Sequence, residues 1–479
     1  MTDAEAGDQG GVWRRSPYLV LAAAFFVIGT TLRVSLCWVN PPSNAFDDHF
    51  APIFMIMKTG AIPAKDACFQ CYQPPVFYCV SAAAGSAAQA VGLAPAHVVK
   101  IMQGLNCVYG VLTLILIYLI LARFELRPDA RVAAFGVACF LPRSIYMSAV
   151  NSNDSLSYLC VAATILVTIV AVERGLSPGW AGTLGLVATV TIFCKYTAFA
   201  VLPMIVAVVI WAAASGVVSW KRAAAALLLA LAPPVAVLGS YMVSNLARYG
   251  DALPWNVGMY DPSVERPRDV ETINFESFRP WEFLGHPVLA PGKLHSFWTI
   301  AYSGMWFDTE PLFQCFLDSN RAWWSRYYAW YRGEAPFPGN NPAIGWLTTV
   351  TADGLVTLGL VPLALGVVGT AAWVFRQRHW ATGPDRIHNP IVGGLLVLAG
   401  FNALGIIWLT HRLPVYCAMK ASYFLETLPA FALFLAIGWM TLAPNRWLRA
   451  ALGTAFGLQF LLAAVHILDI VAATAGPPR

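Results

Sequence analysis

The sequence predicts an all-α polytopic membrane protein, because apolar residues are abundant, charges are scarce, and long apolar runs recur along the chain. Of the 479 residues, 58% are hydrophobic and 11% are charged, and the mean hydropathy is +0.62. Soluble domains are only about 45–50% apolar. Runs of about 20 apolar residues are long enough to cross a bilayer as helices. About eleven such runs occur, near 18–39, 98–122, 131–149, 154–172, 179–194, 197–215, 223–245, 352–375, 390–409, 421–442 and 449–472.

The distribution of cations predicts the orientation of these helices. Short cytoplasmic connections retain Lys and Arg. With the N-terminus inside, every inside connection is basic, and these connections carry Arg14, Arg15, Arg123, Arg127, Arg131, Arg174, Lys221, Arg222, Arg376, Arg378, Arg386, Arg446 and Arg449. An odd number of spans then leaves the C-terminus outside. The formal net charge of +5 is mostly this topology, and no basic patch interleaved with aromatic residues indicates a nucleic-acid partner.

Two long polar segments fall outside in this topology, and they divide the chain. Residues 1–245 form an N-terminal transmembrane module with a first outside segment, 40–95; residues 246–350 form a large outside segment; residues 351–479 form the C-terminal transmembrane helices. In the first outside segment, apolar residues from Phe50 to Met57 recur at helical spacing, which is typical of a helix lying along the membrane interface.

Adjacent carboxylates mark the start of the first outside segment. Asp47 and Asp48 stand within Phe46-Asp47-Asp48-His49-Phe50, where the first apolar run leaves the membrane. A carboxylate at the bilayer edge can act as a general base if its geometry and pKa suit the reaction. The alternative is that both acids only cap the interfacial helix. His49 beside them could hydrogen-bond a substrate.

Cations at the outer edge of the membrane are natural partners of a lipid phosphate. The strongest candidate is Lys420, just before the run 421–442, and the others are Arg412, Lys195 and Arg143. The alternative for each is snorkelling to the interface.

Two further patterns leave alternatives open. Cys68 and Cys71 lack the second pair that a zinc site needs, so a structural disulfide between them, or pairing of either with Cys315, fits better. Asn153 and Asp154 could be catalytic, although such residues are also the usual N-caps of a helix.

Several motifs in order resemble the GT-C superfamily of membrane glycosyltransferases, closest to the branch with bacterial protein-mannosyltransferase-like and lipid-A-sugar transferases. They are Phe46 to Phe50, Tyr72-Gln73-Pro74-Pro75, Asn151 to Asp154, Lys195-Tyr196-Thr197, Arg248 to Asn256, Trp306-Phe307-Asp308 and Lys420 to Phe424. The resemblance implies a GT-C fold with about eleven transmembrane helices and two large outside loops. It implies that Asp47 is the catalytic base, with Asp48 in support, and that Lys420 contacts the donor phosphate. Within the matching motifs we expect Tyr72, Gln73, Trp306 and Asp308 to bind substrate.

The residues and the resemblance together predict an inverting glycosyltransferase of the cytoplasmic membrane, active on its outer, periplasmic or exterior, face. The donor would be a polyprenyl-phosphate-linked sugar, and the acceptor a hydroxyl of a glycan, lipid or protein. The sequence has no soluble nucleotide-binding domain and no convincing D-x-D motif, so no cofactor is expected, and no metal, although some GT-C enzymes use a divalent ion. The alternative function is a flippase or transporter of lipid-linked sugars, which would need polar residues along a path through the membrane.

Overall fold

The computed structural model describes residues 17–42, 49–254, 256, 273–287, 296–307, 325–326, 329, 334–336, 345–380, 387–412 and 420–475, with the side chains of 376–380 and 412 left out. The described residues are almost entirely helical. Nine helical segments among them are long and apolar enough to span a membrane. They are Pro17–Val39 (α1), Pro95–Ala122 (α4), Asn153–Glu173 (α7), Tyr196–Ala214 (η3 and α9), Trp220–Tyr249 (α10), Trp346–Phe375 (within α14 and α15), Asn389–His411 (within α16), Ala421–Leu442 (η8 and α17) and Arg446–Ala475 (α18).

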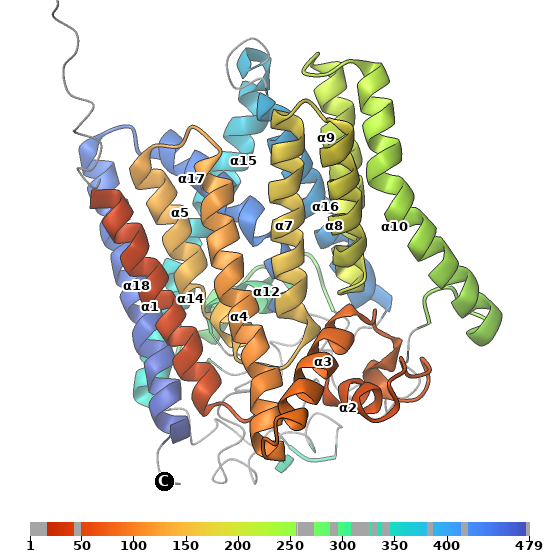
Figure 1. The fold of residues 1–479 in the computed structure, drawn as a ribbon. Coiled ribbons are helices and arrows are strands. Elements are labelled where there is room, and N and C mark those ends of the chain that lie inside the picture. Colours follow the sequence, from red (N-terminus) through yellow and green to blue (C-terminus); the bar gives the residue numbers. More distant parts are fainter. Residues whose placement is uncertain are drawn as a thin grey trace, which may run out of the picture.

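Two of the eleven predicted spans are shorter helices, so the described residues give nine candidate spans. The run 179–194 forms α8, Pro178–Ile192, whose 15 residues rise only about 22 Å, against about 30 Å of hydrocarbon. The run 131–149 is broken into α5, Pro128–Phe140, and α6, Pro142–Ser148. Leu141 is extended between them because a residue before proline avoids the helical region. Both α5 and α8 lie alongside the long helices (Figure 1).

A buried arginine satisfies the backbone at the break between α5 and α6. Arg33 of α1 is fully buried. It donates to the carbonyl oxygens of Gly29 and Cys139 at 2.9 Å each, to Ala138 O at 3.3 Å and to Ser144 Oγ at 2.9 Å. Carbonyl groups without a helical partner are costly in a membrane. Arg33 therefore stabilises the interrupted helix.

The two ends of the helix bundle differ in character. Figure 1 shows α2 (Phe50–Thr59) and α3 (Val76–Ala90) at the lower end, where α18 also ends. A further short helix, α12, spans Phe297–Trp306. At the opposite end α4 finishes and α5, α10 and α18 begin. Seven described arginines lie at or next to these helix ends, namely Arg123, Arg127, Arg131, Arg174, Arg222, Arg446 and Arg449. This arginine-rich end is called the basic end below, although described lysines also lie on the α2–α3 side, among them Lys58 of α2 and Lys65.

At the basic end, one acidic side chain joins α5 to α17 (Leu428–Leu442). Asp129 accepts two hydrogen bonds from the Arg127 guanidinium, both at 3.1 Å, and one from Trp439 Nε1 at 3.0 Å. Burial raises the pKa of this carboxyl, but the hydrogen bonds from Arg127 and Trp439 outweigh it and leave the pKa below its usual value.

Glycines allow two helices to pack closely in the C-terminal half. Gly369 of α15 (Leu360–Trp380) faces Gly438 of α17. A Cβ atom on Gly438 would lie 1.9 Å from Leu365 O, and one on Gly369 would lie 1.8 Å from Phe434 O. Because both obstacles are backbone atoms, no side-chain movement could relieve them. Small residues at such crossings are how membrane helices approach each other.

Candidate functional site

A cavity of about 530 Å³ lies where the segment between α2 and α3 meets the long helices. Its wall comes from His49 and the segment between α2 and α3, the starts of α7 and α9, the last turns of α16 and the turn before α17. The polar residues of the wall are His49, Gln70, Tyr72, Gln73, Asn153, Asp154, Lys195, Tyr196, Thr197, Asn402, Lys420 and Tyr423. Apolar side chains line the rest, including Phe199, Pro203, Phe401, Trp408 and Leu409. The cavity therefore joins a polar region to an apolar one.

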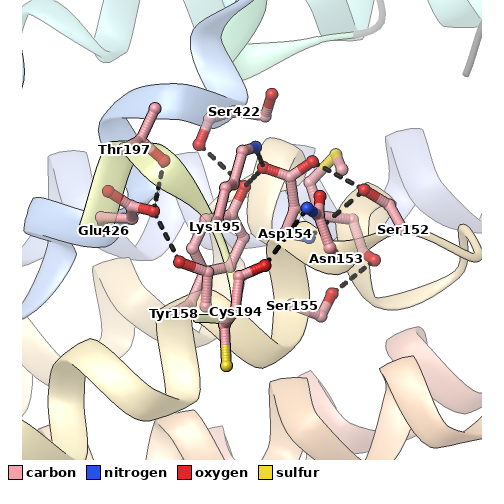
Figure 2. Close-up of polar contacts among 12 residues, drawn as sticks. Ser152, Asn153, Asp154, Ser155, Tyr158, Cys194, Lys195, Thr197, Ser422 and Glu426 are labelled. Atoms are coloured by element: carbon pink, nitrogen blue, oxygen red, sulfur yellow. Dashed lines mark hydrogen bonds and ion pairs between the residues drawn. The ribbon is translucent and has the colours of Figure 1, made fainter. Parts of the chain in front are cut away.

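A buried ion pair stands at the polar end. Lys195 Nζ donates to Asp154 Oδ1, and the two side chains are 7% and 3% exposed (Figure 2). The same ammonium lies 4.6 Å from the centroid of the Tyr423 ring, a cation–π contact. Lys420 lines the same cavity. Two cations and one carboxylate thus border one space that could receive an anion.

The start of α7 holds Asp154 in place. Ser152 is the N-cap, and its hydroxyl donates to Asp154 Oδ2 at 2.7 Å. Tyr158, one turn further on, donates to Asp154 Oδ1 at 3.1 Å or to Ser422 O at 2.7 Å. The capping that the sequence indicated is thus performed by Ser152. Asp154 instead points at Lys195, a pairing that no sequence spacing could reveal.

A second buried carboxylate lies behind the cavity wall. Glu426 is 2% exposed and accepts hydrogen bonds from Ser157 Oγ at 2.6 Å, Thr197 Oγ1 at 2.7 Å and Asn402 Nδ2 at 3.2 Å. These partners come from α7, η3 (Tyr196–Ala200) and α16 (Asn389–Arg412). Sequence reasoning missed Glu426, although an acid within an apolar run was a signal that could have found it.

The segment between α2 and α3 is tied to the rest of the protein. A disulfide joins Cys68 to Cys71 around the turn η2, Phe69–Tyr72, so of the pairings left open the structure has this one. Asn256 Nδ2 donates to Cys68 O at 2.9 Å, and Tyr196 OH donates to Tyr72 O at 3.0 Å. The turn can therefore present its side chains to the cavity from a fixed position.

His49 is anchored just beyond the acidic pair. It is 2% exposed, its Nδ1 lies 2.9 Å from Tyr78 OH, and its Nε2 lies 3.5 Å from Ser152 Oγ. Asp47 and Asp48 are outside the described residues. His49, the first described residue after the acidic pair in the sequence, lines the cavity.

The structure gathers some of the predicted site residues and not others. His49, Tyr72, Gln73, Lys195 and Lys420 all line the cavity. Arg143 does not line it: the side chain is buried, and its Nε donates to Gly304 O at 2.6 Å. Trp306 is also buried elsewhere, at the end of α12, where it contacts Gly359. Asp308 and the side chain of Arg412 lie outside the described part.

No group of three or more His, Cys, Asp and Glu side chains that could hold a metal ion occurs among the residues that the structure describes.

The fold and the cavity together define a polytopic helical membrane protein with one polar site near one end of the bundle. Residues 101–238 match the family model described as dolichyl-phosphate-mannose-protein mannosyltransferase. This range includes Asp154 and Lys195. Comparison with curated protein sequences gives no match.

Comparison with solved structures gives a similar fold in one case and weaker matches in two others. The apo oligosaccharyltransferase of Archaeoglobus fulgidus is 12% identical, with a TM-score of 0.51 over 98% of this chain and 57% of the other. AglB from the same organism, in complex with an inhibitory peptide and a dolichol-phosphate, is 13% identical, with a TM-score of 0.47 over 96% and 56%. ArnT of Cupriavidus metallidurans is 14% identical, with a TM-score of 0.36 over 89% and 79%. The family match and the fold confirm the predicted resemblance to GT-C proteins. The chain spans 57% of the length of the archaeal oligosaccharyltransferase.

Proposed function

We propose that this protein is an integral-membrane inverting glycosyltransferase that moves a sugar from a polyprenyl-phosphate donor to an acceptor hydroxyl. The observation that carries the proposal is the cavity, in which Lys195 and Lys420 border the same space as an apolar wall from α9 and α16. A lipid-linked phosphate needs both kinds of surface. The family match over residues 101–238 supports the same donor class.

The cations would bind the phosphate before and after transfer. When the acceptor oxygen attacks the anomeric carbon, the bond from that carbon to the phosphate oxygen breaks, and the phosphate leaves with the electron pair. The leaving phosphate gains negative charge, so ammonium groups already in place stabilise the transition state more than the ground state. Lys195 and Lys420 have this role in the proposal.

The base for the acceptor hydroxyl would be Asp47, with Asp48 in support. Because a phosphate leaves as an anion, one base suffices and a general acid is not needed. Their neighbour His49 lines the cavity, which is the support that the described residues offer for this assignment. A positioned base contributes about 10²–10⁴-fold to the rate.

The prenyl chain would lie against α16. Phe401 and Trp408 line the cavity and are more than half exposed on the helix surface, at 53% and 58%. A lipid tail could therefore run from the polar end of the cavity to the hydrocarbon around the protein.

We also propose that the cavity faces the periplasm or exterior of a cytoplasmic membrane. The arginines in the short connections at the opposite end, from Arg123 to Arg131 and at Arg174 and Arg222, support this orientation through the positive-inside rule.

The test is transfer of radiolabelled sugar from a panel of polyprenyl-phosphate donors into membrane acceptors. Asp47→Asn and Asp48→Asn are compared with Asp66→Asn, an exposed acid of the same segment that does not line the cavity. We expect Asp47→Asn to lower the rate by at least about 100-fold while the Asp66 variant transfers normally. If no donor yields labelled product, and lipid-linked sugar instead moves across vesicles, the protein is a transporter.

A further inference from the structure

Two short turns present the two cavity lysines. Lys195 directly precedes the 3-10 turn η3, and Lys420 directly precedes the 3-10 turn η8, Ala421–Thr427. The turns lie far apart in the sequence, yet both lysines line one cavity. The binding free energy of a phosphate held between two cations depends on the separation of those cations. The Coulomb attraction between the phosphate and each ammonium falls steeply with distance in a site of low dielectric. Whatever fixes the two turns against each other therefore controls phosphate affinity.

Glu426 makes the direct side-chain link between these turns. It belongs to η8 and accepts the hydroxyl proton of Thr197, in η3, at 2.7 Å (Figure 2). Its other hydrogen bonds, from Ser157 and Asn402, tie the same carboxylate to α7 and α16. A carboxylate at this depth is costly unless its oxygens are fully hydrogen-bonded. Glu426 meets that condition with three donors, two of which, Thr197 and Asn402, line the cavity.

Two further contacts support the junction. Tyr158 can donate to Ser422 O, a backbone atom of η8, at 2.7 Å, and Lys195 lies over the Tyr423 ring of the same turn. Neither contact involves the side chain of Glu426. Removing Glu426 would therefore loosen the two turns without deleting a lysine.

We propose that Glu426 is a positioning residue whose hydrogen bonds set the separation of Lys195 and Lys420, and hence the affinity of the site for the phosphate of a prenyl-phosphate ligand. The inference rests on the proposed function for the identity of that ligand. Glu426 itself does not line the cavity, so it acts through Thr197, Asn402 and its own turn.

The geometry at Asn402 supplies a conservative variant. Asn402 donates from Nδ2, and its Oδ1 is buried with no hydrogen-bond partner. In Glu426→Gln, the new Oε1 can still accept from Ser157 and Thr197. A rotated Asn402 amide would accept from the new Nε2 through its spare oxygen. Glutamine therefore keeps the three links without the charge, whereas Glu426→Ala removes them all.

The experiment measures donor KM in the transfer assay and, separately, binding of farnesyl phosphate to the purified full-length protein in nanodiscs. We expect Glu426→Ala to raise donor KM and the Kd for farnesyl phosphate at least about 10-fold, while Glu426→Gln changes both by less than about 3-fold. A glutamine variant as impaired as the alanine variant, or an alanine variant with unchanged affinity, overturns the positioning role.

A second pair of variants decides the matter if Glu426→Ala does not accumulate. Thr197→Val deletes one link at nearly constant volume, and Thr197→Ser keeps it. Thr168→Val, a buried α7 threonine bonded within its own helix and away from the cavity, is the matched control. We expect only Thr197→Val to weaken farnesyl phosphate binding, and equal binding by the two Thr197 variants would overturn the inference.

The binding measurement separates this inference from the proposed function. If the wild type binds farnesyl phosphate with the expected pattern among variants but transfers no sugar, the positioning role stands and the transferase fails. If it transfers sugar with the same donor KM in every variant, only the positioning role fails.

Discussion

Replacing one member of the buried pair between Asp154 and Lys195 should cost more stability than replacing the other. In Asp154→Asn the Lys195 ammonium, 7% exposed, keeps the Tyr423 ring but loses its carboxylate. In Lys195→Met the carboxylate keeps the Ser152 hydroxyl and can keep that of Tyr158. The aspartate is therefore better compensated without its partner than the lysine is.

The magnitudes follow from this difference. Removing one partner of a buried ion pair costs about 3–5 kcal/mol. For Asp154→Asn we expect the lower end of this range, about 3 kcal/mol, because the unpaired Lys195 borders a cavity. For Lys195→Met we expect a smaller loss, about 1.5 kcal/mol. The hydrogen bonds to the Asp154 carboxylate remain in place and offset part of the cost, since a hydrogen bond to a charged group contributes about 1.5–3 kcal/mol. The double variant has no unpaired charge and should cost about 2 kcal/mol, so the coupling is about 2.5 kcal/mol.

Unfolding by SDS in mixed micelles, followed by tryptophan fluorescence, measures these free energies of unfolding. The matched control is Thr168→Val, in the same helix as Asp154 but away from the cavity. If Lys195→Met is at least as destabilising as Asp154→Asn, or if the coupling is under about 0.5 kcal/mol, the ion pair does not hold the site as described.

Three other perturbations test the fold. Gly438→Ala should destabilise the protein by about 3 kcal/mol or more, because the new Cβ would meet a backbone atom 1.9 Å away. Gly400→Ala, inside α16 with open space around it, should be neutral to stabilising by up to about 1 kcal/mol in the same SDS titration, because alanine is the better helix former. Loss of the Cys68–Cys71 disulfide by double serine substitution should cost at most about 2 kcal/mol, since a disulfide that closes so short a loop removes little chain entropy, and a much larger loss would mean that it supports more than its own turn. Asp129→Asn should destabilise the protein at pH 7, because a carboxyl with a lowered folded-state pKa stabilises the folded protein above its unfolded pKa of about 4. The difference from wild type should shrink as the pH falls through the folded-state pKa, and melting curves that show the same difference at pH 7 and in acid would contradict it.

Much of the architecture was readable because a bilayer imposes simple length and polarity rules. A helix satisfies its own backbone hydrogen bonds, so the apolar runs alone located the nine helices of spanning length in the described part of the chain. The prediction of spans from length and composition was wrong for two of the apolar runs. Apolar composition could not show that α8 stops at Ile192, or that the run 131–149 is interrupted before Pro142.

For the candidate site, the sequence supplied residue types but not their partners. Lys195 and Lys420 were candidates because each is a cation at the end of an apolar run, and both line the cavity. Arg143 met the same criterion, yet the bundle buries it against Gly304 O. A cation at a helix end can face a cavity or a neighbouring helix, and only helix packing distinguishes the two.

The sequence by itself determined that the chain enters a membrane, which segments are helical, and which polar residues lie near their ends, because these depend on local composition and on the solvent. Only the tertiary structure decided that Asp154 pairs with Lys195 and that Glu426 reaches Thr197. These contacts join segments far apart in the chain. They exist because helix packing brings α7, η3, α16 and η8 together, and no local pattern encodes that geometry.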